Sequence, residues 1–159
     1  MDKSALTAAI IAALEKELEG YARSARAAHA EATDEQSKAE NKYDTRGLEA
    51  SYLARGQSRQ AAEVLEAIER FQALGTPEFA PGEAVDLGAL VEIEDQDGRE
   101  RYFIGPRAGG LEITLGRKTV LVITPQSPLG QHLVGRKQGE RFEITMNRQR
   151  RACRVASVC

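Results

Sequence analysis

The first third of the chain carries apolar or small residues at alternating steps of three and four positions. The series consists of Ile11, Leu14, Leu18, Tyr21, Ala25, Ala28 and Ala32. This spacing keeps one stripe of side chains on one side of a helix, so it predicts a helix that packs lengthwise against another. Ser4 can accept hydrogen bonds from the free amides of the first turn. We therefore expect the helix to begin near Ser4 and to run to about Ala32.

A second helical pattern follows a polar segment that covers residues 33–47. It consists of Ala50, Ala54, Ala61, Val64, Ile68 and Phe71. Both patterns carry small residues next to the polar segment and larger ones away from it, so the two gradients match when the helices are antiparallel. Gly75, followed by Thr76 and Pro77, supplies a C-cap and then a residue that cannot continue the helix. We predict a long antiparallel coiled-coil hairpin over residues 1–75, with the polar segment at its tip.

From about residue 82 the pattern changes to the alternation and β-branched runs that are typical of strands. The expected strands are Ala89–Glu94, Arg101–Ile104, Glu112–Leu115, Thr119–Ile123, Arg141–Thr145 and Cys153–Val158. Ser127 and Pro128 can start a short helix between the fourth and fifth strands, and Gly135 can end it. Residues 76–159 are therefore expected to form a small antiparallel β domain with one short helix. The expected fold class is α+β.

The charge of the chain limits the kinds of partner it can have. The formal net charge is -2, made up of -3 on residues 1–75 and +1 on residues 76–159. This balance argues against binding by general neutralisation of nucleic-acid phosphates. A stretch near the C-terminus contains seven basic residues and only two acidic ones, Glu140 and Glu143. The basic residues are Arg136, Lys137, Arg141, Arg148, Arg150, Arg151 and Arg154. Such a cluster is either a solvated strand face or a docking surface for an acidic partner.

The chain does not show a self-contained active site. His29 and His132 fall in different predicted domains, and neither has an evident serine or cysteine partner. Cys153 and Cys159 lack the spacing and histidine partners of a zinc site, so we expect reduced thiols without a function. No apolar run approaches the roughly 20 residues of a membrane span, and the N-terminus lacks a signal-peptide pattern. We expect a cytoplasmic monomer that is not itself an enzyme.

The polar segment holds a group of side chains that could bind a cation. Glu40 and Asp44 are four positions apart, and Asn41 and Asp44 are three apart, so a helical turn would place them on one face. Two carboxylates can bind a hard cation such as Mg²⁺, but only weakly unless a partner supplies further ligands. Asp34 and Glu35 add to the local negative charge. The alternative is an ordinary solvated loop between two helices.

A second motif lies in the short predicted helix. It reads Ser127-Pro128-Leu129-Gly130-Gln131-His132-Leu133-Val134-Gly135-Arg136, followed by Gly139-Glu140. A helical hairpin with an acidic tip, followed by a β domain with this motif, resembles the Gre family of bacterial transcript cleavage factors. The resemblance implies an FKBP-like C-terminal domain that docks on the rim of the secondary channel of bacterial RNA polymerase. It also implies that the coiled coil passes down this channel to the active centre.

The resemblance assigns roles to particular residues. Docking on the rim is expected of Ser127, Pro128, Leu129, Gly130, Leu133 and Val134. Arg46, Arg55 and Arg59 on the second helix are either a solvated face or contacts to RNA or channel walls, as in Gre coiled coils. The 3′ end of the nascent RNA would then be an indirect partner, and any hydrolysis would be performed by the polymerase.

The tip of Gre factors carries an acidic pair spaced D-x-x-E, which helps the polymerase hold a second Mg²⁺ ion. Such an ion stabilises the attacking and leaving oxygens of an in-line displacement. Here the pair falls on Asn41 and Asp44 when counted back from the second helix, or on Ser37 and Glu40 when the local string is aligned. Either register lacks one carboxylate. We expect Asp44, Glu40 and Asn41 to assist the polymerase, with Asp44 and Glu40 as ligands of the shared Mg²⁺.

Three functions stay open on the sequence. The chain could stimulate the cleavage of backtracked RNA, or it could bind the secondary channel without stimulating cleavage and compete with the true factors. It could also be an adaptor or stress protein, unrelated to polymerase, that combines a hairpin with an FKBP-like domain. A prolyl isomerase is disfavoured because the second half offers few aromatic side chains for a pocket, namely Phe79, Tyr102, Phe103 and Phe142, and no tryptophan.

Overall fold

The computed structural model describes residues 2–33, 46–146 and 149–159. The chain divides into two compact units. One is Ala12–Ile68, and the other joins Met1–Ile11 with Glu69–Cys159. We refer to the first as the hairpin unit and to the second as the sheet unit. The sequence prediction placed the division after residue 75, whereas in the structure Met1–Ile11 and the residues from Glu69 onward group with the β domain.

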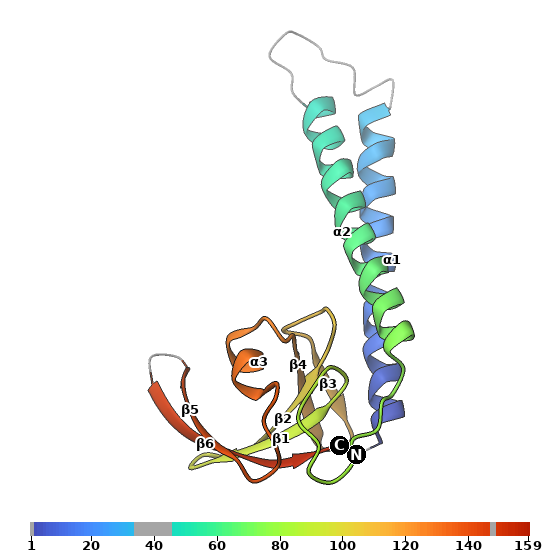
Figure 1. Cartoon of the computed structure of the whole chain (residues 1–159). Coiled ribbons are helices and arrows are strands. Elements are labelled where there is room, and N and C mark those ends of the chain that lie inside the picture. The colour runs from blue at the N-terminus through green and yellow to red at the C-terminus, as the bar shows by residue number, and fades with distance from the viewer. Residues whose placement is uncertain (1, 34–45, 147–148) are drawn as a thin grey trace. The chain divides into compact units, whose positions relative to one another are not determined.

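Two long helices, α1 (Lys3–Thr33) and α2 (Arg46–Leu74), supply the hairpin unit. Within this unit they lie side by side (Figure 1). Ala28 of α1 and Ala50 and Val64 of α2 are buried. The described part of this unit contains no third element, so each helix covers the small residues of the other. The predicted pair of long helices is confirmed.

Local hydrogen bonds cap the start of α1 and the end of α2. At the start of α1, Asp2 rather than Ser4 is the cap, because its Oδ1 accepts hydrogen bonds from the amides of Ser4 and Ala5 at 2.9 and 3.4 Å. A carboxylate there also faces the positive end of the helix dipole. At the end of α2, Gly75 adopts a φ of 62° and donates its N–H to the Phe71 carbonyl at 3.2 Å. The predicted stop at Gly75 is confirmed.

The sheet unit contains a six-stranded sheet in the order β3-β4-β2-β1-β6-β5. Its strands are β1 (Leu90–Asp95), β2 (Gly98–Ile104), β3 (Glu112–Leu115), β4 (Lys118–Ile123), β5 (Arg141–Met146) and β6 (Gln149–Val158). The six expected strands are present with shifted ends. One detail differs from the expectation: β2 and β4 pair in parallel, so the sheet is mixed rather than wholly antiparallel. The β3–β4 hairpin folds back so that β4, and not β3, lies beside β2.

Neighbouring residues of β2 point to opposite faces of the sheet and so build two apolar layers. Ile104 lies in the layer that includes the short helix α3 (Pro128–Leu133). Phe103, on the other face, stacks on Phe71 of α2 with 6.3 Å between ring centroids. Gly105 leaves the space that this ring needs, since a Cβ there would lie 2.9 Å from Cζ of Phe71. The end of α2 is therefore held on the sheet by aromatic packing.

Candidate functional site

The motif that carries the family resemblance forms α3, and its local sequence explains its geometry. Ser127 is the N-cap: its Oγ accepts a hydrogen bond from the Gly130 amide at 3.1 Å and donates one to the Thr124 carbonyl at 2.8 Å. Pro128 occupies the first turn, where its missing amide proton is not needed. Gly135 follows the helix with a φ of 87°. The predicted start and end of this helix are confirmed.

Three of the six residues expected to dock are buried in the core of the sheet unit. Leu129 and Leu133 are 6% and 0% exposed, and Gly130 is also buried. At Gly130 a Cβ would lie 1.9 Å from the Thr124 carbonyl oxygen, so the backbone of α3 lies directly against the preceding loop. The side chains of Leu129 and Leu133 therefore hold α3 on the sheet, and their docking role stays a prediction. Pro128 is the exposed member of the set.

An apolar cavity of about 320 Å³ lies beside α3. Its lining combines α3 with strands β2, β4 and β5 and consists of Tyr102, Leu121, Ile123, Ser127, Pro128, Leu129, Ile144 and Thr145. A neighbouring cavity shares Pro128, Ile144 and Thr145 with it and adds the polar side chains of His132, Glu143 and Arg150. A largely apolar lining next to a few charged groups is suited to receiving an apolar side chain of a protein partner.

The strand residues of this cavity could not be predicted from the sequence. Leu121 and Ile144 are alternating apolar positions of two predicted strands, and nothing in the local pattern distinguishes them from other core positions. Only the parallel pairing of β2 with β4, and the contact of α3 with β5, bring them to the same place.

The basic cluster near the C-terminus is largely paired within the sheet unit. The guanidinium of Arg151 reaches the carboxylates of Asp95, Asp97 and Glu100. Arg154 pairs with Glu94, also from β1. These acidic partners are far away in the sequence, which explains why counting only the neighbouring glutamates overestimated the local positive charge. The pairing favours the solvated strand face over an acidic-partner docking surface.

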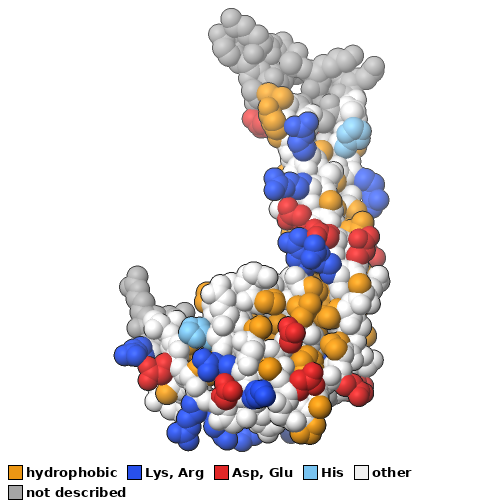
Figure 2. Space-filling view, viewed as in Figure 1, with side chains coloured by type: hydrophobic (Ala, Val, Ile, Leu, Met, Phe, Trp, Pro, Cys, Tyr) orange, Lys and Arg blue, Asp and Glu red, His pale blue; other side chains and the backbone are white. Residues whose placement is uncertain are grey.

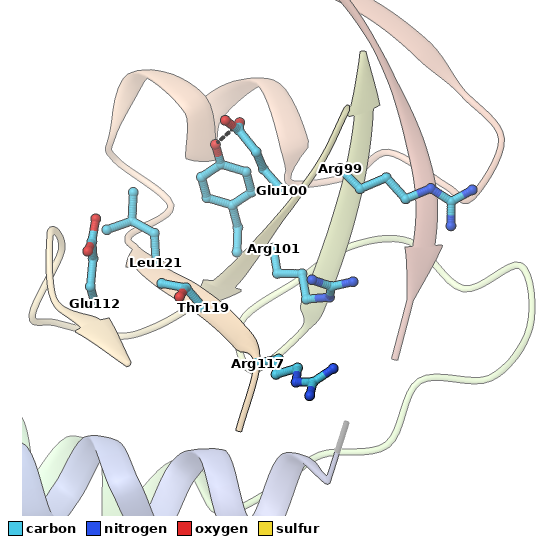
Figure 3. Close-up of a pocket in the computed structure, with 8 residues that line it drawn as sticks. Arg99, Glu100, Arg101, Glu112, Arg117, Thr119 and Leu121 are labelled. Carbon is cyan, nitrogen blue, oxygen red and sulfur yellow. Dashed lines mark hydrogen bonds between the residues drawn. The ribbon is translucent and has the colours of Figure 1, made fainter. Parts of the chain in front are cut away.

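A third cavity, of about 400 Å³, lies where β2 and β4 separate. Figure 3 shows Arg101 and Arg117 on one side of it, and Glu100 and Glu112 on the other. Arg101 is paired with Glu92 at 2.6 Å. Because both signs of charge line this cavity and part of the positive charge is already paired, its electrostatics select no single class of ligand.

Tyr102 connects this cavity to the ion pairs of Arg151, through their shared partner Glu100. Its hydroxyl donates a hydrogen bond to Oε2 of Glu100 at 2.7 Å, drawn as the dashed line in Figure 3. Burial, followed by the hydrogen bond and the charge of Glu100, raises the pKa of the Tyr102 phenol well above its ordinary value. The phenol therefore stays protonated at neutral pH and acts as a donor.

The basic residues predicted to contact nucleic acid lie on α2. Arg55 and Arg59 are exposed and four positions apart, so they share one face of the helix. Arg59 pairs with Glu63 at 3.2 Å, an exposed pair of little energetic value. Arg46 is the first residue of α2, and its side chain lies outside the described part of the structure. Figure 2 shows Lys and Arg side chains spread along the hairpin unit.

The predicted tip residues Ser37, Glu40, Asn41 and Asp44 lie outside the described residues. Their roles and the shared Mg²⁺ therefore stay predictions. Within residues 2–33, 46–146 and 149–159, no group of three His, Cys, Asp or Glu side chains could hold a metal ion. The same part of the chain has no helix that is long and apolar enough to cross a membrane. Cys153 and Cys159 are both free thiols.

The family profile described as "Transcription elongation factor, GreA/GreB, C-term" matches residues 80–159. The chain belongs to the GreA/GreB family. Two similar solved structures are GreA factor homolog 1 (Gfh1) of Thermus thermophilus and Gfh1 of Thermus aquaticus. The first is 21% identical with a TM-score of 0.39, and the match covers 94% of each chain. The second is 22% identical with a TM-score of 0.39, and the match covers 91% of this chain and 90% of the other.

The resemblance to Gre factors is thereby confirmed, as is the α+β fold with long N-terminal helices. No curated protein matches the chain. As a Gre-family factor, the chain is an accessory of RNA polymerase rather than an unrelated adaptor. The matched residues 80–159 include α3 and both cavities beside it.

Proposed function

We propose that the chain binds RNA polymerase at the secondary channel and stimulates the cleavage of backtracked RNA by the polymerase active site. The observation that carries this proposal is the GreA/GreB match over residues 80–159, the segment that builds the cavities beside α3. In this proposal the sheet unit docks on the rim and the hairpin unit enters the channel. The chain acts as a cytoplasmic monomer.

Docking is assigned to the apolar cavity beside α3 and to its exposed proline. Pro128 lines both neighbouring cavities, so a side chain bound in either one touches it. An apolar anchor from the polymerase would enter the larger cavity, and Glu143 and Arg150 would meet polar groups at its side. A charge at Leu129 would disrupt the fold as well as docking, because this side chain is buried.

The docking test is therefore Pro128→Asp. An acidic residue is well tolerated in the first turn of a helix, so α3 should keep its structure while the cavity loses an apolar wall. We expect the affinity for core polymerase to fall about tenfold or more, the size typical of an interface anchor. The matched control is Gln131→Asp, which places the same charge on an exposed position of α3 that lines neither cavity. Equal affinity of both variants would exclude this docking surface.

At the tip, we propose that Asp44, Glu40 and Asn41 present oxygen atoms to the polymerase active centre. Carboxylate and amide oxygens are ligands that Mg²⁺ accepts, and a shared ion needs further ligands from the partner. When bound, the ion supplies positive charge that stabilises the oxygens of the reacting phosphate. Asp44 and Glu40 would hold the ion, and Asn41 would add a weaker carbonyl ligand.

An RNA cleavage assay on backtracked polymerase tests the tip. Asp44→Ala and Glu40→Ala should each lower the cleavage rate at least tenfold, while Asp34→Ala, which removes a carboxylate outside the proposed set, should leave it within twofold of the wild type. Polymerase affinity is measured in parallel so that lost docking is not mistaken for lost cleavage. Unchanged cleavage by both tip variants would exclude their role.

A second candidate function is a channel-binding regulator that does not stimulate cleavage and competes with active Gre factors. It is favoured by Asn41, a neutral residue that occupies one of the two acidic positions when the family pattern is counted back from the second helix. If the wild type binds polymerase and inhibits an active factor without stimulating cleavage, this second function holds. In that case Asn41→Asp, which restores the acidic pair with Asp44, should introduce cleavage activity.

A further inference from the structure

The pairing of β2 with β4 covers only part of both strands. Residues 102–104 of β2 pair with residues 121–123 of β4, although β2 begins at Gly98 and β4 at Lys118. The cavity of about 400 Å³ lies where the two strands separate, and residues 99–102 of β2 form part of its lining. Residues 98–101 pair with β1 on one side. We refer to the other side of residues 98–101, which faces the cavity, as the open edge of β2.

Backbone groups of the open edge point into this gap. In an antiparallel pair, every second residue directs its N–H and C=O to the neighbouring strand, and the residues between direct theirs away from it. The N–H of Ile104 donates to the Ala89 carbonyl at 2.9 Å, so the even-numbered residues of β2 face β1. Arg99 and Arg101 therefore direct their backbone groups away from β1. An edge of this kind is a template to which an extended chain can bind.

The charged side chains of the open edge are held over β1 and do not cover its backbone. Arg99 pairs with Glu92 and Glu94 at 3.1 and 3.3 Å. Arg101 pairs with Glu92 at 2.6 Å. Figure 3 shows the side chain of Arg99 extending away from Leu121 of β4. Charged residues often guard a strand edge against pairing, but here ion pairs with β1 leave the backbone accessible.

We propose that the open edge of β2 binds an extended segment of a partner protein, which adds a strand beside residues 98–101. The segment carries an acidic residue next to a basic one, because Arg117 and Glu112 line the cavity from opposite sides. Neither has an ion-pair partner within the part of the chain that the structure describes. Adjacent residues of a strand point to opposite faces, so one segment can reach both charges. The inference goes beyond the proposed function, since no residue of α3 lines this cavity.

Other occupants fit the open edge less well. Antiparallel pairing of two copies through the outward-facing residues, Arg99 and Arg101, would put arginine opposite arginine, and like charges directly opposite each other are destabilising. A nucleic acid would bring its phosphates against Glu100 and Glu112. An extended polypeptide supplies partners for the free backbone groups and for both charges.

The first experiment tests whether binding uses the backbone. The probe is a fluorescein-labelled peptide of about eight residues, the length of a typical strand, in which threonine and valine alternate around one aspartate–lysine pair. Two further peptides carry N-methyl groups on the odd or on the even positions, which removes the N–H donors of one edge and keeps every side chain. Each is titrated with the full chain and followed by fluorescence anisotropy. We expect one methylated peptide to lose about tenfold or more in affinity, and the other to bind as the unmethylated peptide does. Equal effects of the two methylation patterns, or no binding of the unmethylated peptide, would overturn the proposal.

The second experiment changes the open edge itself. Arg99→Pro removes the N–H that points away from β1, and proline is accommodated on a strand edge when its N–H side faces outward. The matched control is Arg99→Ala, which loses the same side chain and keeps the N–H. The proline variant should bind the unmethylated peptide about tenfold more weakly than the alanine variant, with equal far-ultraviolet circular dichroism as evidence of folding. Equal affinities of the two folded variants would exclude pairing at residue 99. The methylated peptides test the same contact without any change to the chain.

The charges are tested by combining a variant with a changed peptide. Arg117→Glu should weaken binding of the unmethylated peptide about tenfold, because it places a carboxylate near the aspartate of the peptide. A peptide with asparagine in place of this aspartate should bind the wild type and Arg117→Glu with similar affinity. Equal losses for both peptides would overturn the assignment of the acidic residue to Arg117.

The docking variant separates this inference from the proposed function. Pro128→Asp should bind the unmethylated peptide as the wild type does, because Pro128 does not line the cavity at the open edge. Loss of peptide binding in this variant would show that the peptide occupies the cavity beside α3, and would overturn the inference. Failure of the wild type to bind polymerase would overturn the proposed function and leave the peptide results standing.

Discussion

The two units of the chain place large and small apolar side chains in opposite ways. In the sheet unit Phe71 and Phe103 are completely buried against each other. At the start of α2 in the hairpin unit, Ala50 is buried while Leu48 and Tyr52 are exposed. A buried methyl group contributes about 0.8 kcal/mol, much less than a buried aromatic ring. The Phe71–Phe103 contact therefore contributes more to stability than the alanine packing at the start of α2, where the large side chains stay at the surface.

The strongest test of this comparison truncates one large side chain in each unit. Phe71→Ala should lower the free energy of unfolding by about 3–5 kcal/mol, because it removes a buried ring and leaves a cavity over Gly105. Leu53→Ala removes a large but exposed side chain and should change it by less than about 0.5 kcal/mol. Urea denaturation of the full chain measures both. Similar losses for the two variants would mean that Leu53 is not exposed as described.

A smaller loss of stability is expected at Gly130, where backbone packing leaves no space for a side chain. Gly130→Ala should destabilise the sheet unit by about 1–3 kcal/mol, because its Cβ would overlap the Thr124 carbonyl oxygen at 1.9 Å. The loss is read from urea denaturation monitored by near-ultraviolet circular dichroism. Wild-type stability of Gly130→Ala would show that α3 can move away from the loop at no cost.

A glycine-to-alanine substitution in the hairpin unit should raise the stability of the chain instead of lowering it. Gly56 lies within α2 and has no atom within 4 Å of an added Cβ, so Gly56→Ala should stabilise the chain by up to about 1 kcal/mol. The control is Gly75→Ala, where the positive φ of 62° makes a side chain unfavourable. Thermal unfolding should show a higher Tm for the first variant and a lower Tm for the second. A lower Tm for Gly56→Ala would indicate a contact that the described residues do not show.

The smallest expected effect is on the pH dependence of the free energy of unfolding. The raised pKa of Tyr102 means that its protonated phenol stabilises the folded state below the unfolded pKa of about 10, and that this contribution is lost as pH rises toward the folded pKa. Between neutral pH and pH 10, the free energy of unfolding of the wild type should fall by about 0.4 kcal/mol more than that of Tyr102→Phe. Urea denaturation at pH 8, 9 and 10 measures the difference. Tyr52→Phe, which removes an exposed phenol, is the control, and identical slopes for the two variants would exclude the assignment to Tyr102.

Much of the fold could be predicted because it depends on local signals. The three- and four-residue spacing predicted both long helices, and alternation predicted all six strands within a few residues of their ends. Ser127, Pro128 and Gly135 marked α3 correctly, because a cap acts on amides only three positions away. The same logic failed at Ser4, because Asp2, two positions earlier, accepts the hydrogen bonds from the first turn instead. The motif around α3 was also sufficient to indicate the family.

The sequence by itself thus determined the elements, their positions to within a few residues, and the family, because each depends on a few neighbouring residues. The tertiary structure decided that β4 pairs in parallel with β2, that Leu129 and Leu133 face inward, and that Arg151 meets distant carboxylates. These outcomes depend on which surfaces meet when the chain folds. Burial and ion pairing are set by neighbours in space, and a linear pattern does not specify them.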